Sequence, residues 1–305
     1  MQKKILFTGG SGLLALNCSI YLRKDFEIYL GLHNRIINLK GINTCKLDLE
    51  NEVELEKTLI KIKPDILINT AGMTNVEECE LNSIEAFKIN SFIPGLLAKL
   101  SERLGIYFIH ISTDHLFDGS KNFLTELEPT CPINVYGKSK ELGELEVLRN
   151  NKDALILRIN FFGWGTKYRK SFSDYIIENL RLNKEIDLFD DVFYTPILIS
   201  TALSCIEFLI EKRENGIFHI VSNEKITKYD FGILLADQFK LNKTLINKSS
   251  IKSKINLKQR PLDMSLANTK FRNLFSLDIL SIKAQIQLLN NQQFDEGFAE
   301  LRNLN

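Results

Sequence analysis

Short apolar runs alternate with longer amphipathic segments through the first half of the chain, which predicts strands that alternate with helices. The expected strands are Lys4–Thr8, Glu27–Leu32, Thr44–Leu47, Asp65–Thr70, Tyr107–Ser112 and Ala154–Ile159. The expected helices are Leu13–Arg23, Glu52–Ile62, Ser83–Leu104 and Val135–Arg149. Strands with Ile and Leu on both faces are typical of a buried parallel sheet. The pattern therefore predicts an α/β fold with a doubly wound parallel sheet of the Rossmann type.

The rhythm changes near Phe161, and residues 161–305 are expected to form a smaller α/β lobe beside the Rossmann domain of residues 1–160. Its expected elements are helices Ser171–Leu182, Ile199–Lys212 and Thr227–Phe239, strands Glu185–Phe189 and Gly216–Val221, and one final helix. Part of residues 185–222 is expected to return to the main sheet. The lysine-rich stretch Lys243–Lys258 is interpreted as a solvated loop rather than an anion site.

Composition excludes several classes of protein. The 305 residues carry a net charge of +1, which gives no reason to expect a nucleic-acid partner. No apolar run approaches the ~20 residues of a membrane span. Five cysteines without CxxC spacing fit free thiols in a reducing cytoplasm, and four histidines without an HExxH pair give no catalytic metal site. Residues Lys3-Lys4 imitate the start of a signal peptide, but Thr8–Gly12 interrupts the apolar run, so we expect a soluble cytoplasmic protein.

The first strand runs into the glycine turn Leu6–Ala15 (LFTGGSGLLA) and then into a helix. Gly9, Gly12 and Ala15 fit the GxxGxxG/A spacing of dinucleotide-binding turns, where a pyrophosphate approaches the N–H groups of a helix N-terminus. The alternative is a glycine turn without a ligand. The strand before it and the helix after it favour the cofactor interpretation.

The end of the second strand bears on the choice of cofactor. Tyr29–Ile37 contains no acid to bind the ribose hydroxyls of NAD, whereas Arg35 could accept the 2′-phosphate of NADP. His33 or Asn34 could add a hydrogen bond. NADP(H) is therefore favoured, NAD(H) is the alternative, and Arg35 could instead be a plain surface cation. Asp48 could accept from the adenine amino group or cap the helix near Glu52.

Tyr136 and Lys140 lie one helical turn apart in the segment Tyr136-Gly-Lys-Ser-Lys140. Reduction of a ketone leaves an alkoxide that needs a proton, and an ammonium beside a phenol lowers the pKa of the phenol. Thr113 could hold the carbonyl oxygen of the substrate. His115 is not read as the base of a Ser/His/Asp hydrolase, because no GxSxG motif is present.

Polar residues follow three of the expected strands, at Thr8-Gly9, Asn69-Thr70-Ala71 and Ser112-Thr113-Asp114. The carboxyl ends of parallel strands meet at one edge of the sheet, where ligands bind. These three segments are therefore expected to converge on one crevice.

The motifs together resemble those of the extended short-chain dehydrogenase/reductases, in the dTDP-4-dehydrorhamnose reductase-like branch. The similarity covers most of the chain, through TGGSGLLA, INTAGMTNVEECE, the KIN around Asn90, ISTDHLFDG, EPTCPINVYGKSKELGE and RPLDMSL. It implies a catalytic trio of Thr113, Tyr136 and Lys140, with Asn90 fixing the geometry around the lysine.

The full set of expected site residues follows from motifs and resemblance together. Cofactor contacts are expected from Gly9, Gly12, Leu13, Leu14, His33, Asn34, Arg35, Asp48, Leu49, Thr70, Ala71, Gly72, Asn90, Tyr136 and Lys140. Substrate contacts are expected from Thr74, Asp114, His115, Asn160 and Arg260.

The resemblance implies an NADPH-dependent reductase of the 4-keto group of a nucleotide-linked deoxysugar, serving surface polysaccharide synthesis, with a homodimer as a possible assembly. The branch usually has tyrosine at the position of His115 and often tryptophan near Phe161-Phe162, so the particular sugar stays open. A nucleotide-sugar epimerase or dehydratase with tightly bound NAD is one alternative. A cofactor-binding regulatory subunit without turnover is the other.

Overall fold

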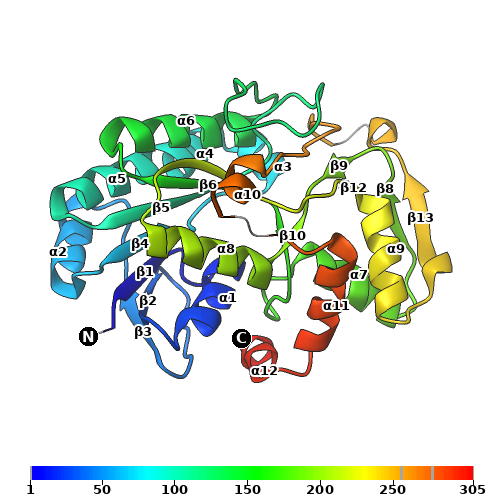
Figure 1. Cartoon of the computed structure of the whole chain (residues 1–305), viewed down its shortest axis with the longest axis horizontal. Coiled ribbons are helices and arrows are strands. Elements are labelled where there is room, and N and C mark those ends of the chain that lie inside the picture. The colour runs from blue at the N-terminus through cyan, green and yellow to red at the C-terminus, as the bar shows by residue number, and fades with distance from the viewer. Residues whose placement is uncertain (1, 255–256, 276–277, 305) are drawn as a thin grey trace.

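A seven-stranded parallel sheet forms the centre of the computed structural model, which describes residues 2–254, 257–275 and 278–304 (Figure 1). The strand order is β11-β6-β5-β4-β1-β2-β3. The strands are β1 (Lys4–Thr8), β2 (Glu27–Leu32), β3 (Ile42–Lys46), β4 (Ile66–Asn69), β5 (Tyr107–Ser112), β6 (Leu155–Ile159) and β11 (Gly216–Ile220). The prediction of a doubly wound α/β fold is confirmed.

Successive side chains of each strand point to opposite faces of the sheet, and both faces are apolar. Helices therefore cover both of them. Ile5 and Phe7 of β1 belong to the core beneath α1 (Leu13–Leu22) and α8 (Ile199–Lys212). Leu6 belongs to the second core, beneath the other helices. Those helices are α2 (Glu52–Ile62), α5 (Ile93–Leu104) and α6 (Val135–Asn150). The sheet is thus fully covered, and its carboxyl edge is left for ligands.

The single helix expected over Ser83–Leu104 is wrong in detail, because the chain divides it into three parts. These are α4 (Ser83–Phe87), the π-helical η1 (Lys88–Phe92) and α5, preceded by α3 (Val76–Leu81). The carboxamide of Asn90 bonds Met73 and the Ser139 hydroxyl, and the backbone of Asn90 lies against Gly143 of α6. The π turn lets the carboxamide of Asn90 reach both Met73 and Ser139. Single π turns inside α-helices are frequent at functional sites.

The second half builds a smaller lobe with its own apolar core around Phe162, Trp164 and Phe231 (Figure 1, right). Its strand pairs are β7 (Phe161–Phe162) with β10 (Ile197–Leu198), β8 (Ile186–Phe189) with β13 (Ile246–Ser249), and β9 (Phe193–Tyr194) with β12 (Ile226–Thr227). Its helices are α7 (Phe172–Arg181), α9 (Lys228–Gln238), the 3-10 helices η2 (Lys243–Leu245) and η3 (Ile251–Ser253), and α11 (Ile282–Gln292). Two later helices, α10 (Thr269–Phe275) and α12 (Glu296–Asn303), contact β11 and α1 and contribute to the core of the main sheet.

Gly216–Ile220 joins the main sheet beside β6, as expected for part of residues 185–222, whereas Ile186–Phe189 pairs with β13. Two other expectations for this half need correction. Three helices rather than one follow the basic segment, where Lys243–Lys258 contains β13 as well as loops. Within it, residues 255–256 lie outside the described residues.

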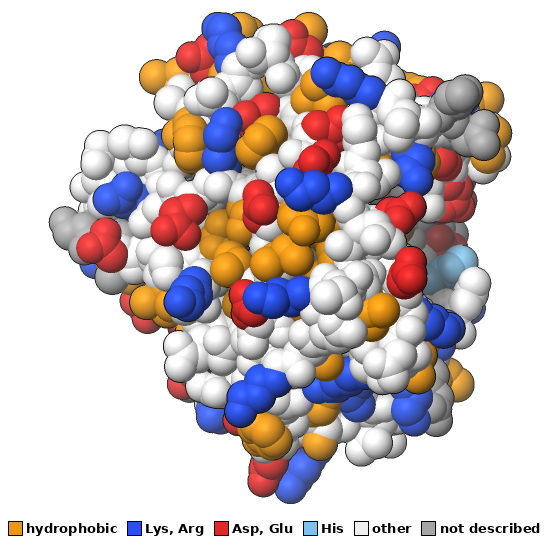
Figure 2. Space-filling model, turned by 90° about the vertical axis from the view of Figure 1, so that its right-hand side faces the viewer, with side chains coloured by type: hydrophobic (Ala, Val, Ile, Leu, Met, Phe, Trp, Pro, Cys, Tyr) orange, Lys and Arg blue, Asp and Glu red, His pale blue; other side chains and the backbone are white. Residues whose placement is uncertain are grey.

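The end of the molecule formed by the small lobe carries interspersed acidic and basic side chains around a central group of hydrophobic ones (Figure 2).

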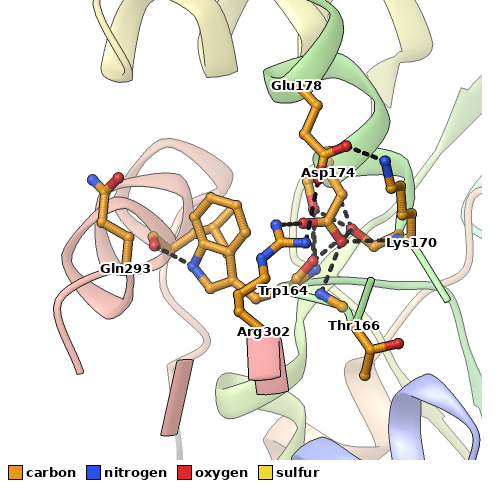
Figure 3. A network of polar contacts seen from close by, with 12 residues as sticks. Trp164, Thr166, Lys170, Asp174, Glu178, Gln293 and Arg302 are labelled. Atoms are coloured by element: carbon orange, nitrogen blue, oxygen red, sulfur yellow. Dashed lines mark hydrogen bonds and ion pairs between the residues drawn. The ribbon is translucent and has the colours of Figure 1, made fainter. Parts of the chain in front are cut away.

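The end of the chain is tied to the small lobe through a buried carboxylate (Figure 3). Arg302 of α12 donates to Asp174, which is fully buried, at 2.5 Å, and to Glu178 at 3.2 Å. Asp174 also accepts from the backbone N–H of Gly165 at 2.8 Å and forms a capping box with Ser171. The loop between β7 and α7 is therefore held in place by α12.

Across the described ranges, no helix combines the length and apolarity needed to cross a bilayer. All five cysteines are free thiols.

Candidate active site

A cavity of about 260 Å³ opens at the carboxyl edge of the main sheet, between the glycine turn and α6. Its walls are Gly12, Leu13, Leu14, Thr70, Ala71, Gly72, Thr74, Ile111, Ser112, Tyr136, Lys140, Ile159, Phe161, Arg169 and Lys170. Of the three polar strand ends predicted to converge, two reach this cavity, through Thr70-Ala71 and Ser112, and Gly9 lines a second cavity instead. Both candidate catalytic side chains of α6 face the same space as the glycine turn.

The glycine turn fits a dinucleotide pyrophosphate by its shape. Gly9 has a φ of +61°, and a Cβ placed there would lie 2.8 Å from the Cα of Ala71. A Cβ on Gly12 would lie 3.0 Å from the carbonyl oxygen of Gly9. Gly12 also gives α1 no side-chain cap, so the first N–H groups of the helix face the cavity without a protein acceptor from that residue. These features leave room for a phosphate and donors to bind it.

A second cavity of about 230 Å³ continues from the turn toward β2 and β3. Its walls are Gly9, Gly10, Ser11, Gly31, His33, Leu47, Asp48, Leu49, Glu50, Ala71, Ile89 and Ile93. Asp48 accepts from the backbone N–H of Glu50, whereas the N-cap of α2 is Asn51. The alternative reading of Asp48 as the cap of that helix is therefore wrong. The position suits the adenosine half of the cofactor.

Arg35 is exposed and stands outside the walls of both cavities, and its guanidinium stacks 3.7 Å from the ring centroid of Tyr168. The hydroxyl of Tyr168 donates to the carbonyl of Ser11 in the glycine turn at 3.1 Å. The small-lobe loop thus touches both the turn and the candidate 2′-phosphate residue. Asn34 is exposed and stands outside the walls of both cavities.

Tyr136 is buried on the first turn of α6, which begins at the Asn134 cap. Burial raises the pKa of its phenol well above 10, and a hydrogen bond with Thr113 opposes that rise. The ring of His115 packs edge-on against it, with centroids 5.4 Å apart. The phenol is therefore held as a proton carrier beside Thr113, with neither group exposed.

Lys140 is 5% exposed and points inward from α6. Its Nζ donates to the carbonyl of Ile111 at 2.7 Å and lies 3.2 Å from Nε2 of His110. Burial lowers the pKa of Lys140 to about 8, against a smaller opposing effect of Glu144. The expectation that the ammonium lowers the pKa of Tyr136 needs revision, because burial dominates at the phenol. Asn90 holds Met73 and Ser139 rather than Lys140 itself.

The candidate substrate residues fall into two groups. Asp114 is buried and accepts from Asn160 at 2.6 Å, directly after Thr113. Thr74 lines the first cavity. Arg260 lies farther out and pairs with Glu77 of α3 at 2.6 Å, which fastens the small lobe to the Rossmann half. Its charge still reaches His115, where it helps burial to lower the pKa of the imidazole.

Several site residues were missed in the sequence. Arg169 and Lys170 line the first cavity from the small lobe, and the buried hydroxyl of Ser112 has no hydrogen-bond partner there. Lys228 lies 3.2 Å from the ring centroid of Tyr194, and Asp114 influences the pKa of both. Ser112 lies in the motif ISTDHLFDG, next to the predicted Thr113. Arg169, Lys170 and Lys228 lie in no motif whose spacing could have predicted them. Among the described residues, no group of three or more His, Cys, Asp or Glu side chains could hold a metal ion.

Comparison with known proteins identifies the family to which this chain belongs. The chain is 31% identical to the probable low-salt glycan biosynthesis reductase Agl14 of Haloferax volcanii over 247 residues, covering 79% of this chain and 82% of that protein. A hypothetical dTDP-4-dehydrorhamnose reductase from Sulfolobus tokodaii superposes with a TM-score of 0.80 at 31% identity, covering 92% of this chain and 98% of that one.

A third match concerns the fold alone. The dTDP-4-dehydrorhamnose reductase of Bacillus anthracis, solved in complex with NADP, has a TM-score of 0.86 at 22% identity, covering 96% of this chain and 100% of that one. The model of the RmlD substrate binding domain matches residues 3–293. The chain therefore belongs to the RmlD substrate-binding domain family.

Proposed function

We propose that this protein is an NADPH-dependent reductase of the 4-keto group of a nucleotide-linked deoxysugar, acting in surface polysaccharide synthesis. The observation that carries the proposal is the common cavity of the glycine turn, Tyr136 and Lys140. The Agl14 and dTDP-4-dehydrorhamnose reductase relatives support the substrate class. The five free thiols are consistent with a reducing compartment such as the cytoplasm.

The cofactor would be held by the backbone of the glycine turn at its pyrophosphate and by Arg35 at its 2′-phosphate. His33, Asp48 and Leu49 would surround the adenosine end, where they line the second cavity. When bound, the nicotinamide supplies the hydride for the carbonyl carbon. Arg169 adds a cation from the opposite side of the first cavity.

Tyr136 would donate the proton that the substrate oxygen needs. A raised pKa keeps the phenol protonated at neutral pH, which is the state that a reductase requires before each turnover. An epimerase or dehydratase must also take a proton from the substrate, and a high pKa disfavours the phenolate for that step. Thr113, hydrogen-bonded to the phenol, is placed to hold the same oxygen.

Lys140 would replace the proton on the phenol and contact the nicotinamide ribose, because its ammonium is buried beside the cavity. Asp114, fixed by Asn160, would bind a sugar hydroxyl next to the reacting carbon. The chain thus offers a proton donor, a proton reservoir and a sugar anchor around one space.

The test is to follow NADPH absorbance with a panel of nucleotide 4-keto sugars, for the parent protein and for Tyr136→Phe. The loss of a general acid is expected to lower kcat by about 10³-fold while NADPH still binds. Tyr175→Phe, at a tyrosine that is 45% exposed on α7, is the matched control and should keep full activity. Equal rates for parent and Tyr136→Phe on every substrate would overturn the assignment, and a parent without turnover would favour the regulatory alternative.

A further inference from the structure

A chain of buried polar side chains runs beneath the cavity from the first strand to Lys140. Thr8, Asn69 and His110, one from each of β1, β4 and β5, are all fully buried. The Thr8 hydroxyl donates to Oδ1 of Asn69 at 2.5 Å, and the amide N–H of Asn69 donates to Nδ1 of His110 at 3.0 Å, so the neutral imidazole carries its proton on Nε2. The other ring nitrogen, Nε2, faces Lys140 at 3.2 Å. Neighbouring parallel strands place these residues side by side at Thr8–Asn69 and Asn69–His110.

The geometry at Lys140 accounts for each of its donors. A neutral amine has two N–H groups and one lone pair. One N–H is directed at the carbonyl of Ile111 and the lone pair faces the Nε2–H of His110, so the second N–H is left to face the cavity that Lys140 lines. Without His110, the lone pair would have no fixed direction, and the remaining N–H would not be aimed.

The chemical type of this partner matters as well as its position. Burial beside Lys140 lowers the pKa of His110 far below its usual range, so the imidazole stays neutral. A carboxylate at the same place would favour the ammonium and hold its proton. The neutral imidazole donates its Nε2–H toward Nζ, because Asn69 presents its amide N–H to the far ring nitrogen while its oxygen accepts from Thr8.

Two other cations, Arg169 and Lys170 of the small lobe, line the same cavity as Lys140. Glu144 lies four residues farther along α6 and raises the pKa of Lys140 by its charge. The carboxylate of Glu144 also forms an ion pair with Arg158 of β6 at 2.7 Å. Tyr136 is the remaining titratable group of α6 at the cavity. His110 is therefore the side chain in direct contact with the ammonium through which the sheet can act on it.

We propose that His110 is a positioning residue for the reduction: as a neutral partner it aims one N–H of Lys140 into the cavity and leaves the lysine free to exchange its proton during turnover. This inference rests on the proposed function for its consequence in catalysis. The Thr8–Asn69–His110 chain also links the strand of the glycine turn to the proton reservoir.

The experiment compares His110→Phe, His110→Glu and His110→Gln with the parent. One readout is the pH dependence of Lys140 modification by a small acylating reagent, acetic anhydride, located by mass spectrometry in protein without substrate. The other is the alkaline limb of kcat. Removing a donor that favours the neutral amine in His110→Phe should move both curves about one pH unit higher.

The charged variant gives the larger shift in the same direction. The carboxylate of His110→Glu should move both curves about one unit further than His110→Phe, and His110→Gln, which keeps a neutral N–H donor, should stay near the parent. His219→Gln is the matched control, because His219 is buried in β11, which β6 separates from β5, and bonds Ala267 and Arg158 instead of Lys140. It should leave both curves in place.

Curves that do not separate Glu from Gln, or that move equally in His219→Gln, would overturn the role of His110. The Glu–Gln pair decides the matter even where His110→Phe fails to fold. Because the labelling needs no substrate, a protein that labels as expected but reduces no sugar would contradict the proposed function alone.

Discussion

Tyr136 and Lys140 stand on a helix packed against the main sheet, and their polar atoms are engaged by Thr113, Ile111 and His110. Across the site, the hydroxyl of Tyr194 in the small lobe is buried without a hydrogen-bond partner. Lys228 rests over the ring of Tyr194 and lies 4.9 Å from the ring centroid of Phe172. Burial lowers the pKa of both lysines to about 8.

The two lysines differ in whether their N–H groups have a fixed direction. Hydrogen bonds fix where the protons of Lys140 point, whereas ring faces and the charge of Asp114 attract Lys228 without choosing an orientation. The sheet side is thus suited to chemistry that is the same in every turnover. Buried polar atoms without a partner lie on both sides, at Ser112 and at Tyr194, but the loosely directed Lys228 makes the lobe side the more adaptable of the two.

The largest expected effect tests how the lobe side is supported. Arg302→Met leaves the carboxylate of Asp174 buried with its positive partner removed, so the free energy of unfolding should fall by about 3 kcal/mol in urea denaturation. Lys170→Met removes the exposed pair with Glu178 and should cost less than about 1 kcal/mol. Equal losses in the two variants would show that the buried pair is not the support of the lobe.

The next effect tests the sheet side. Gly9→Ala places a methyl group against the backbone of Ala71 and should raise the Kd of NADPH about 100-fold, measured by fluorescence titration. Gly41→Ala is the matched control, because Gly41 also has a positive φ, +75°, but its Cβ would meet open space. An unchanged Kd in Gly9→Ala would remove the turn from the cofactor site.

Cofactor choice comes third. Arg35→Ala removes the cation proposed for the 2′-phosphate, so the ratio of kcat/KM for NADPH over NADH should fall about tenfold. Arg103→Ala, at an exposed arginine paired with Glu56 on the far helices, should leave the ratio unchanged. A constant ratio in Arg35→Ala would favour the plain surface-cation reading.

The smallest effect concerns Lys228 of the small lobe, whose ammonium interacts with the charge of Asp114. Lys228→Met should raise the KM for the nucleotide sugar about fivefold without changing the KM for NADPH, because an adaptable cation contributes roughly 1 kcal/mol. Lys225→Met, whose ammonium pairs with Asp263 at 2.7 Å in the same lobe, serves as the control. A change in kcat with constant KM would instead give Lys228 a place in the chemistry.

The contrast also explains what could be predicted from the sequence. The apolar strands and the glycine turn are local patterns, so β1 and β2 were predicted to the residue. The spacing of Tyr136 and Lys140 likewise needs one helix only. The contacts of Lys228 with Tyr194, and of His110 with Lys140, depend on elements that meet only after folding. The π turn at Asn90 was missed because its neighbours Met73 and Ser139 decide it.

The tie between Arg302 and Asp174 has a consequence for biosynthesis. The two residues are 128 positions apart, and the loop that Asp174 anchors carries Arg169 and Lys170 to the wall of the cavity. During translation, Asp174 emerges long before Arg302, so its carboxylate has no guanidinium partner until α12 is made. The cavity wall that carries Arg169 and Lys170 therefore gains its anchor only after α12 has folded against it.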